Sequence, residues 1–237
     1  MTDTLVTILL LVPALVIAIV FHEVAHGLAA RALGDPTAQE QRRLSLNPLR
    51  HVDPVGTLLV PGFLALVGGP VFGWAKPVPV NARRLNNPRR DMMLVAAAGP
   101  GMNLLLAAVG ALALAVFFPG APPLTEILFS AAPLPQNVSA IAILGLSFFI
   151  LINCFLAFFN LLPIPPFDGS HILEGALPRS MAVHFAKLRQ VGLLFFVLLV
   201  AASWAFPQFD LIGRLVGPPV EWMLGIYQQL ANLVAGA

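Results

Sequence analysis

Charged residues are scarce in this sequence. Only 10% of its 237 residues are Asp, Glu, Lys or Arg, whereas a soluble domain usually carries about a quarter. Together with 58% hydrophobic residues, this composition predicts an integral membrane protein, with the lipid bilayer as its surroundings. The single cysteine, Cys154, excludes a disulfide within the chain. Basic residues do not cluster among aromatic ones, so nucleic acid is not an expected partner.

Long apolar stretches with few or no charges predict four membrane-spanning helices in a single domain of residues 1–237. The first stretch, about residues 5–30, is long enough to cross a bilayer as a helix. A further C-terminal helix is expected at residues 219–235, after the break at Gly217-Pro218-Pro219, where it either spans the membrane or lies at its surface. The other three predicted spans are residues 92–118, 138–162 and 190–206.

Proline and glycine are frequent, at 22 and 19 residues, which predicts interrupted helices. Residues 56–72 are apolar but broken by both types, so we expect a short re-entrant or β-hairpin segment here rather than a span. Residues 73–80 contain Pro77 and Pro79 and should be extended, because a residue before proline avoids the helical region. This stretch is either a rigid connector or a strand edge with which an unwound substrate peptide can pair. The predicted fold class is an all-α polytopic membrane protein.

The cations are distributed unevenly along the chain. Residues 31–90 and 163–189 contain 12 of the 13 Lys and Arg residues, and residues 119–137 contain none. Because cytoplasmic loops of membrane proteins are enriched in Lys and Arg, the first two regions are expected in the cytoplasm. The N-terminus is then external, and the cytoplasmic end of the first span lies near residue 26.

The sequence His22-Glu23-Val24-Ala25-His26 falls inside the first apolar stretch. On a helix, His22 and His26 lie on one face, one turn apart, and can bind a single zinc ion. Glu23 points elsewhere but can reach a water on that metal and accept its proton. The pattern alone also fits two hydrogen-bonded helix histidines. However, ionisable groups inside a membrane are costly and usually functional, which favours a metal site.

A catalytic zinc site needs a third protein ligand, and Asp168 is the preferred candidate. It follows the third predicted span, at the same cytoplasmic end as the histidines, after a proline-rich helix end. The alternative is an ordinary Asp-Gly turn. His171 is a second candidate for the ligand, whereas Asp35, between Gly34 and Pro36, lies in a loop and is a poor one.

Three segments resemble the signatures of the site-2 protease family of intramembrane zinc metalloproteases: residues 22–26, 98–103 (AGPGMN) and 160–169 (NLLPIPPFDG). The third signature usually ends in Leu-Asp-Gly, and here Phe167 replaces the leucine. The resemblance extends over about residues 15–175 and matches the compact branch, which lacks PDZ and CBS domains. It implies a core of three motif-bearing helices with additional helices around it, and one zinc ion per chain. The implied ligands are His22, His26 and Asp168, with Glu23 as the general base.

Two further expectations concern the second signature. Gly99, Pro100 and Gly101 would let this helix approach a neighbour closely. Asn103, one turn further, could donate a hydrogen bond to the scissile carbonyl of a substrate; a role in holding the fold together is equally compatible with the sequence.

The predicted function is zinc-dependent hydrolysis of peptide bonds within membrane-spanning segments of substrate proteins. We expect a prokaryotic cell membrane, with the active site toward the cytoplasm. Two alternatives are a metal-ion transporter and a catalytically silent scaffold that binds helices. A transporter would need ligands across the whole bilayer, whereas these residues cluster at one depth, and the intact Glu23 argues against a silent scaffold.

Overall fold

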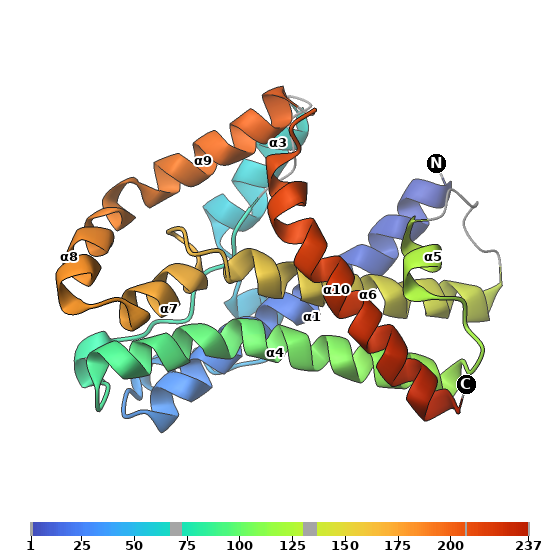
Figure 1. The fold of residues 1–237 in the computed structure, drawn as a ribbon, viewed down its shortest axis with the longest axis horizontal. Helices are drawn as coiled ribbons and strands as arrows, with labels where there is room; N and C mark the ends of the chain where they lie inside the picture. The colour runs from blue at the N-terminus through green and yellow to red at the C-terminus, as the bar shows by residue number, and fades with distance from the viewer. Residues whose placement is uncertain (1, 67–72, 130–136, 207, 237) are drawn as a thin grey trace. The chain divides into compact units, whose positions relative to one another are not determined.

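The structure, a computed structural model, describes residues 2–66, 73–129, 137–206 and 208–236. Their secondary structure is helical, with no strand in these ranges, so the prediction of an all-α protein is confirmed. The elements in chain order are α1 (Thr2–Ala32), α2 (Thr37–Glu40), η1 (Pro48–Arg50), η2 (Pro54–Leu59), α3 (Val60–Leu66), η3 (Ala82–Arg84), α4 (Pro88–Phe117), α5 (Leu124–Phe129), α6 (Val138–Asn160), α7 (Asp168–Ala176), α8 (Arg179–Lys187), α9 (Arg189–Ala205) and α10 (Leu211–Ala235) (Figure 1).

Three of the described helices are long and apolar enough to cross a membrane, at Thr4–Ala32, Pro88–Phe117 and Val138–Asn160. They correspond to three of the predicted spans. Helix α9 has 17 residues, which is about 25 Å at 1.5 Å per residue, somewhat less than the ~30 Å of hydrocarbon. Its role as a fourth span therefore stays a prediction.

The C-terminal helix begins earlier than expected. Helix α10 starts at Leu211 and continues through Pro218 and Pro219, so the predicted break and the predicted start at 219 are wrong. The prolines remove two backbone hydrogen bonds, but their fixed φ is compatible with a helix. A buried stripe at helical spacing runs on both sides of the prolines and keeps the helix continuous through them: Val216, Val220, Leu224, Tyr227 and Ala231.

The apolar segment after residue 55 is helical where the structure describes it. Pro54 opens a π-helix that continues into α3, and the Asp53 side chain caps it by accepting from the N–H groups of Val55 and Gly56. The β-hairpin alternative therefore does not hold for residues 56–66, and residues 67–72 lie outside the described ranges. Trp74 N–H donates to the Gly56 carbonyl at 3.0 Å, so residue 74 lies beside residue 56. A re-entrant segment requires its two ends to lie close together in this way.

The backbone forms two compact units, and the spanning helices α1 and α4 each contribute to both. Unit 1 comprises residues 1–18, 101–159 and 216–237, and unit 2 comprises residues 19–100 and 160–215. All 13 Lys and Arg residues belong to unit 2.

In unit 1, helices α4 and α6 pack closely. A methyl group at Gly110 would lie 2.9 Å from the Ile150 side chain, so the glycine permits this approach. The Asn103 amide joins two elements by donating to the Ala18 carbonyl at 3.1 Å and to Asn153 Oδ1 at 2.9 Å.

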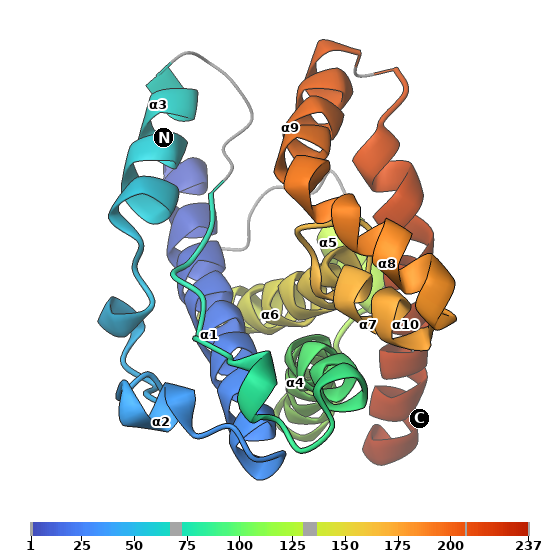
Figure 2. The same ribbon diagram turned by 90° about the vertical axis from the view of Figure 1, so that its left-hand side faces the viewer.

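In unit 2, a small apolar core of Ala30, Leu85 and Val95 joins the end of α1 to the beginning of α4. The extended residues 73–81 run beside this part of α1 (Figure 2). The packing brings the HEVAH turn of α1, the beginning of α4 and the chain around α7 into one compact unit.

Candidate metal centre

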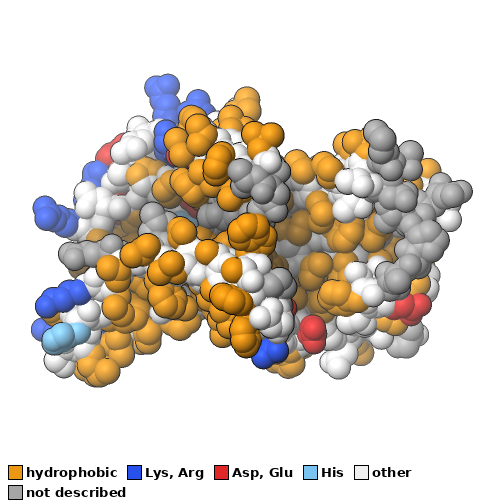
Figure 3. Space-filling model, turned by 90° about the horizontal axis from the view of Figure 1, so that it is seen from above, with side chains coloured by type: hydrophobic (Ala, Val, Ile, Leu, Met, Phe, Trp, Pro, Cys, Tyr) orange, Lys and Arg blue, Asp and Glu red, His pale blue; other side chains and the backbone are white. Residues whose placement is uncertain are grey.

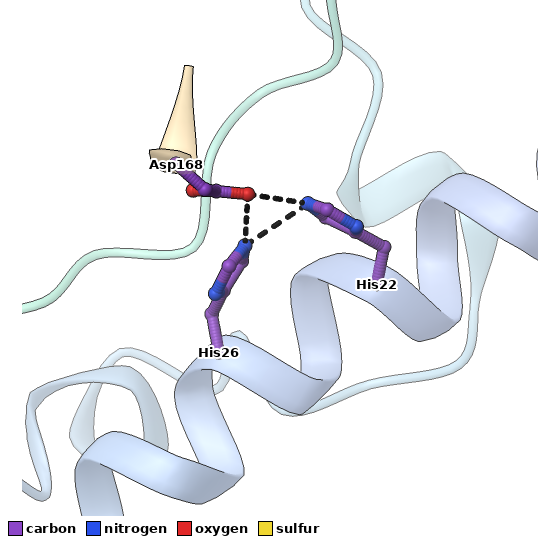
Figure 4. Close-up of side chains that lie close together, drawn as sticks. All are labelled: His22, His26 and Asp168. Carbon is purple, nitrogen blue, oxygen red and sulfur yellow. Dashed lines mark hydrogen bonds and ion pairs between the residues drawn. The ribbon is translucent and has the colours of Figure 1, made fainter. Parts of the chain in front are cut away.

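The two histidines of α1 lie on one face of the helix, as their spacing predicts. Both are buried, with 7% and 8% of their surface exposed for His22 and His26. Their Nε2 atoms are 3.0 Å apart and point toward the same space (Figure 4).

Asp168 completes the group as the first residue of α7. Its Oδ2 atom lies 3.2 Å from His22 Nε2 and 3.3 Å from His26 Nε2. Gly169 makes this position possible, because a Cβ there would lie 2.1 Å from the Leu161 carbonyl oxygen. Only glycine lets α7 begin directly against the chain that leaves α6. In the described part of the chain, these three residues form the one group suited to a metal ion.

The three donor atoms fit a zinc ion. Tetrahedral zinc with bonds of 2.0–2.1 Å separates its ligand atoms by about 3.4 Å. The observed separations of 3.0, 3.2 and 3.3 Å are close to this value. Asp168 Oδ2 is buried, and no described residue donates a hydrogen bond to it, so a cation is the partner that its lone pairs lack.

A backbone carbonyl fixes the protonation of His26. Its Nδ1 lies 2.7 Å from the Val95 oxygen, and since a carbonyl only accepts, Nδ1 carries the proton. The lone pair of Nε2 is then directed at His22 and Asp168. Such a hydrogen bond on the far nitrogen is the usual way in which a protein orients a metal-binding histidine.

Gly99 of α4 packs directly against both imidazoles. A Cβ at this position would lie 2.4 Å from His26 Nε2 and 2.6 Å from His22 Nε2. At Gly101, by contrast, a Cβ would meet nothing within 4 Å. Close approach, which the sequence suggested for both glycines, is thus required at Gly99 alone.

Glu23 is held by the extended segment beside α1. Its Oε2 accepts a hydrogen bond from Val78 N–H at 2.7 Å. Val78 lies between Pro77 and Pro79, which have no N–H, so it carries the one backbone donor of this tripeptide. Asp35, fully buried, holds the same segment by accepting from Asn81 N–H at 2.6 Å.

The structure places the remaining candidates elsewhere. Asn103 is fully buried in unit 1, and both hydrogens of its amide are engaged by Ala18 and Asn153. Contact with a substrate would require these bonds to break, so that role stays a prediction. His171 does not belong to the metal-binding group and lines a separate cavity.

Few sequence features point to the groups that orient this site. Val78 and Val95 act through backbone atoms, which have no side-chain signature. The prolines that flank Val78 were the available signal, because they leave its N–H as the one backbone donor of residues 77–79. Asp35 was set aside as a loop residue, although its complete burial marks it as structural.

A helix bearing His-Glu-x-x-His, with a carboxylate beside both histidines, inside an apolar helical protein defines a membrane-embedded zinc metallopeptidase. The comparisons with known proteins agree. The chain belongs to Peptidase family M50, the site-2 protease family, whose sequence profile matches residues 10–202.

Two similar proteins are named as zinc metalloproteases. The chain is 38% identical over 189 residues to YwhC of Bacillus subtilis (strain 168), covering 80% of this chain and 78% of that protein. It is 30% identical over 205 residues to Rip2 of Mycobacterium tuberculosis (strain ATCC 25618 / H37Rv), covering 83% of this chain and 71% of Rip2. No solved structure matches the chain significantly.

Proposed function

We propose that this zinc metalloprotease hydrolyses peptide bonds inside the membrane, within the spanning segments of other membrane proteins, as a step of regulated proteolysis. The observation that carries the proposal is the position of His22, Glu23 and His26 on a helix apolar enough to span the bilayer. A peptidase that acted only on soluble chains would have no need of ionisable groups there, where they are costly.

His22, His26 and Asp168 would hold the zinc ion and leave one position open. When bound, zinc makes water more acidic and polarises a carbonyl. Glu23 then accepts the proton of the attacking water and later gives it to the leaving amine. Val78 N–H orients the Glu23 carboxylate for this transfer through one oxygen, and the Val95 carbonyl orients the His26 ring through Nδ1 so that Nε2 faces the metal position.

We further propose that the site faces the cytoplasm of a prokaryotic cell. The metal ligands belong to unit 2, which also contains every Lys and Arg of the chain. Cytoplasmic segments are enriched in these residues, and the return of the chain from residue 56 to residue 74 supports a segment that does not cross.

Cysteine labelling tests this orientation in a Cys154→Ser background. A membrane-impermeant thiol reagent added outside intact cells should modify Leu128→Cys and leave Asn86→Cys and Ser180→Cys unmodified. In permeabilised cells the last two should react, which controls for their accessibility. Labelling of Asn86→Cys from outside would mean that the segment before it crosses the membrane, and would reverse the orientation.

The substrate helix must unwind before attack, because a helix occupies its own carbonyls. Gly and Pro ease unwinding, since they cost about 1 and 3 kcal/mol relative to Ala inside a helix. Replacing them with Leu or Ala in the cytoplasmic half of a substrate should therefore slow cleavage about tenfold. The same replacements in the external half serve as the matched control and should have little effect. Equal rates for all these substrates would rule out unwinding near the cytoplasm as a determinant.

A further inference from the structure

A cavity of about 570 Å³ lies in unit 2, and none of its lining residues is a metal ligand. Its walls come from the beginning of α4 and from α7 and α8, which lie near one another in Figures 1 and 2. The volume is within the range of about 300–1,000 Å³ for sites that bind small molecules.

Two arginines line this cavity. Arg89 is half-buried, and its Nη2 donates to the carbonyl of Leu177, just after α7, and at 3.2 Å to that of Glu174, in the last turn of α7. These bonds hold the guanidinium in place, while its buried Nε forms no hydrogen bond within the described part of the chain. Arg179, the first residue of α8, adds a second guanidinium. Glu174 is the one carboxylate among the lining residues, so the charge of the cavity is positive.

The rest of the wall is largely apolar, with contributions from Met92, Ala182, Val183 and Ala186. The cavity therefore matches a ligand that combines an anionic group with a hydrocarbon part.

The cavity lies beside the charged start of α4, the level at which this spanning helix would meet the membrane surface. Arg89 and Arg90 open this spanning helix, and after Asp91 no charge follows up to Phe117. In the view of Figure 3, several Lys and Arg side chains lie toward the left, with hydrophobic side chains next to them. A phosphate at this level would belong to a lipid headgroup, with its acyl chains directed toward the apolar layer.

We propose that this cavity binds an anionic phospholipid, with its phosphate between Arg89 and Arg179 and the start of an acyl chain against Met92, Ala182 and Ala186. Guanidinium groups suit this role because their planar array of donors matches phosphate oxygens in pairs. The site is separate from the metal centre and does not depend on the proposed proteolysis.

Binding is measured on the full chain, stripped of lipid in detergent, by native mass spectrometry. Short-chain phosphatidylglycerol, short-chain phosphatidylcholine and soluble glycerol phosphate are the three probes. Phosphatidylglycerol should bind one per chain, at least about tenfold more tightly than either of the others. Arg179→Gln and Ala186→Phe should each weaken it about tenfold, the first by removing a charge and the second by filling the cavity.

Arg90→Gln is the matched control, since it removes a neighbouring charge that does not line the cavity, and it should bind like the unaltered protein. Arg89→Gln is avoided, because Arg89 also binds the carbonyls that end α7. Equal loss in Arg90→Gln and Arg179→Gln would reduce the effect to surface charge and overturn the proposal. Equal binding of phosphatidylcholine would overturn the anionic preference, and equal binding of glycerol phosphate would overturn the assignment to a lipid.

Discussion

Zinc should be lost when any of His22, His26 or Asp168 is replaced with alanine, and cleavage should disappear with it. Each change removes one of three donor atoms that lie 3.0–3.3 Å apart, and two protein ligands do not make a stable catalytic site. Glu23→Gln should instead keep one zinc per chain and lose about 10²–10⁴-fold in rate, because it removes the proton acceptor alone. Metal analysis and a cleavage assay on the same purified samples measure both effects.

His184→Ala is the control for this series, since His184 is exposed on α8 and belongs to no metal-binding group in the described residues. It should retain zinc and activity. Full zinc and full activity in Asp168→Ala would disprove the third ligand, and His171 would then be the next candidate. Loss of zinc in Glu23→Gln would mean that Glu23 itself binds the metal.

Gly99→Ala should impair the site nearly as severely, although it removes no ligand. Its new Cβ would lie 2.4 Å from His26 Nε2 and 2.6 Å from His22 Nε2, closer than carbon and nitrogen can approach. One or both rings must turn away, so we expect zinc affinity to fall at least 10–100-fold, as when the supports of a metal ligand are removed. Zinc affinity is measured by competition with a chelating dye.

Gly101→Ala is the matched control on the same helix, because its Cβ meets nothing within 4 Å. Alanine favours a helix over glycine by up to about 1 kcal/mol, so this variant should be as stable as the original protein or more so. If Gly99→Ala and Gly101→Ala had equal zinc affinity, contact between α4 and the histidines would not shape the site.

Much of the fold followed from the sequence, because charge-free stretches and helical length leave few alternatives in a membrane. Three predicted spans coincide with the long apolar helices at α1, α4 and α6. The helix through Pro218 and Pro219 was not predictable from local propensity, because a buried stripe on both sides of the prolines keeps α10 continuous.

The site was predictable to the extent that it depends on side chains. The period of a helix brings His22 and His26 to one face, and the order of the spans brings Asp168 to their end of the protein. The contacts of Val78, Val95 and Gly99 depend on how segments pack, and a single sequence carries no direct record of that packing. Their roles follow from the three-dimensional structure.

The central claim is tested most directly by mapping the cut in a membrane-spanning substrate. The purified protein and a single-span substrate are reconstituted together in lipid vesicles, and the fragments are identified by mass spectrometry before zinc removal, after it and after zinc is restored. We predict one cut inside the spanning segment, in its cytoplasmic half, that stops without zinc and returns with it. A cut outside the segment, or one that persists after zinc is removed, would contradict a zinc-dependent peptidase acting within the membrane.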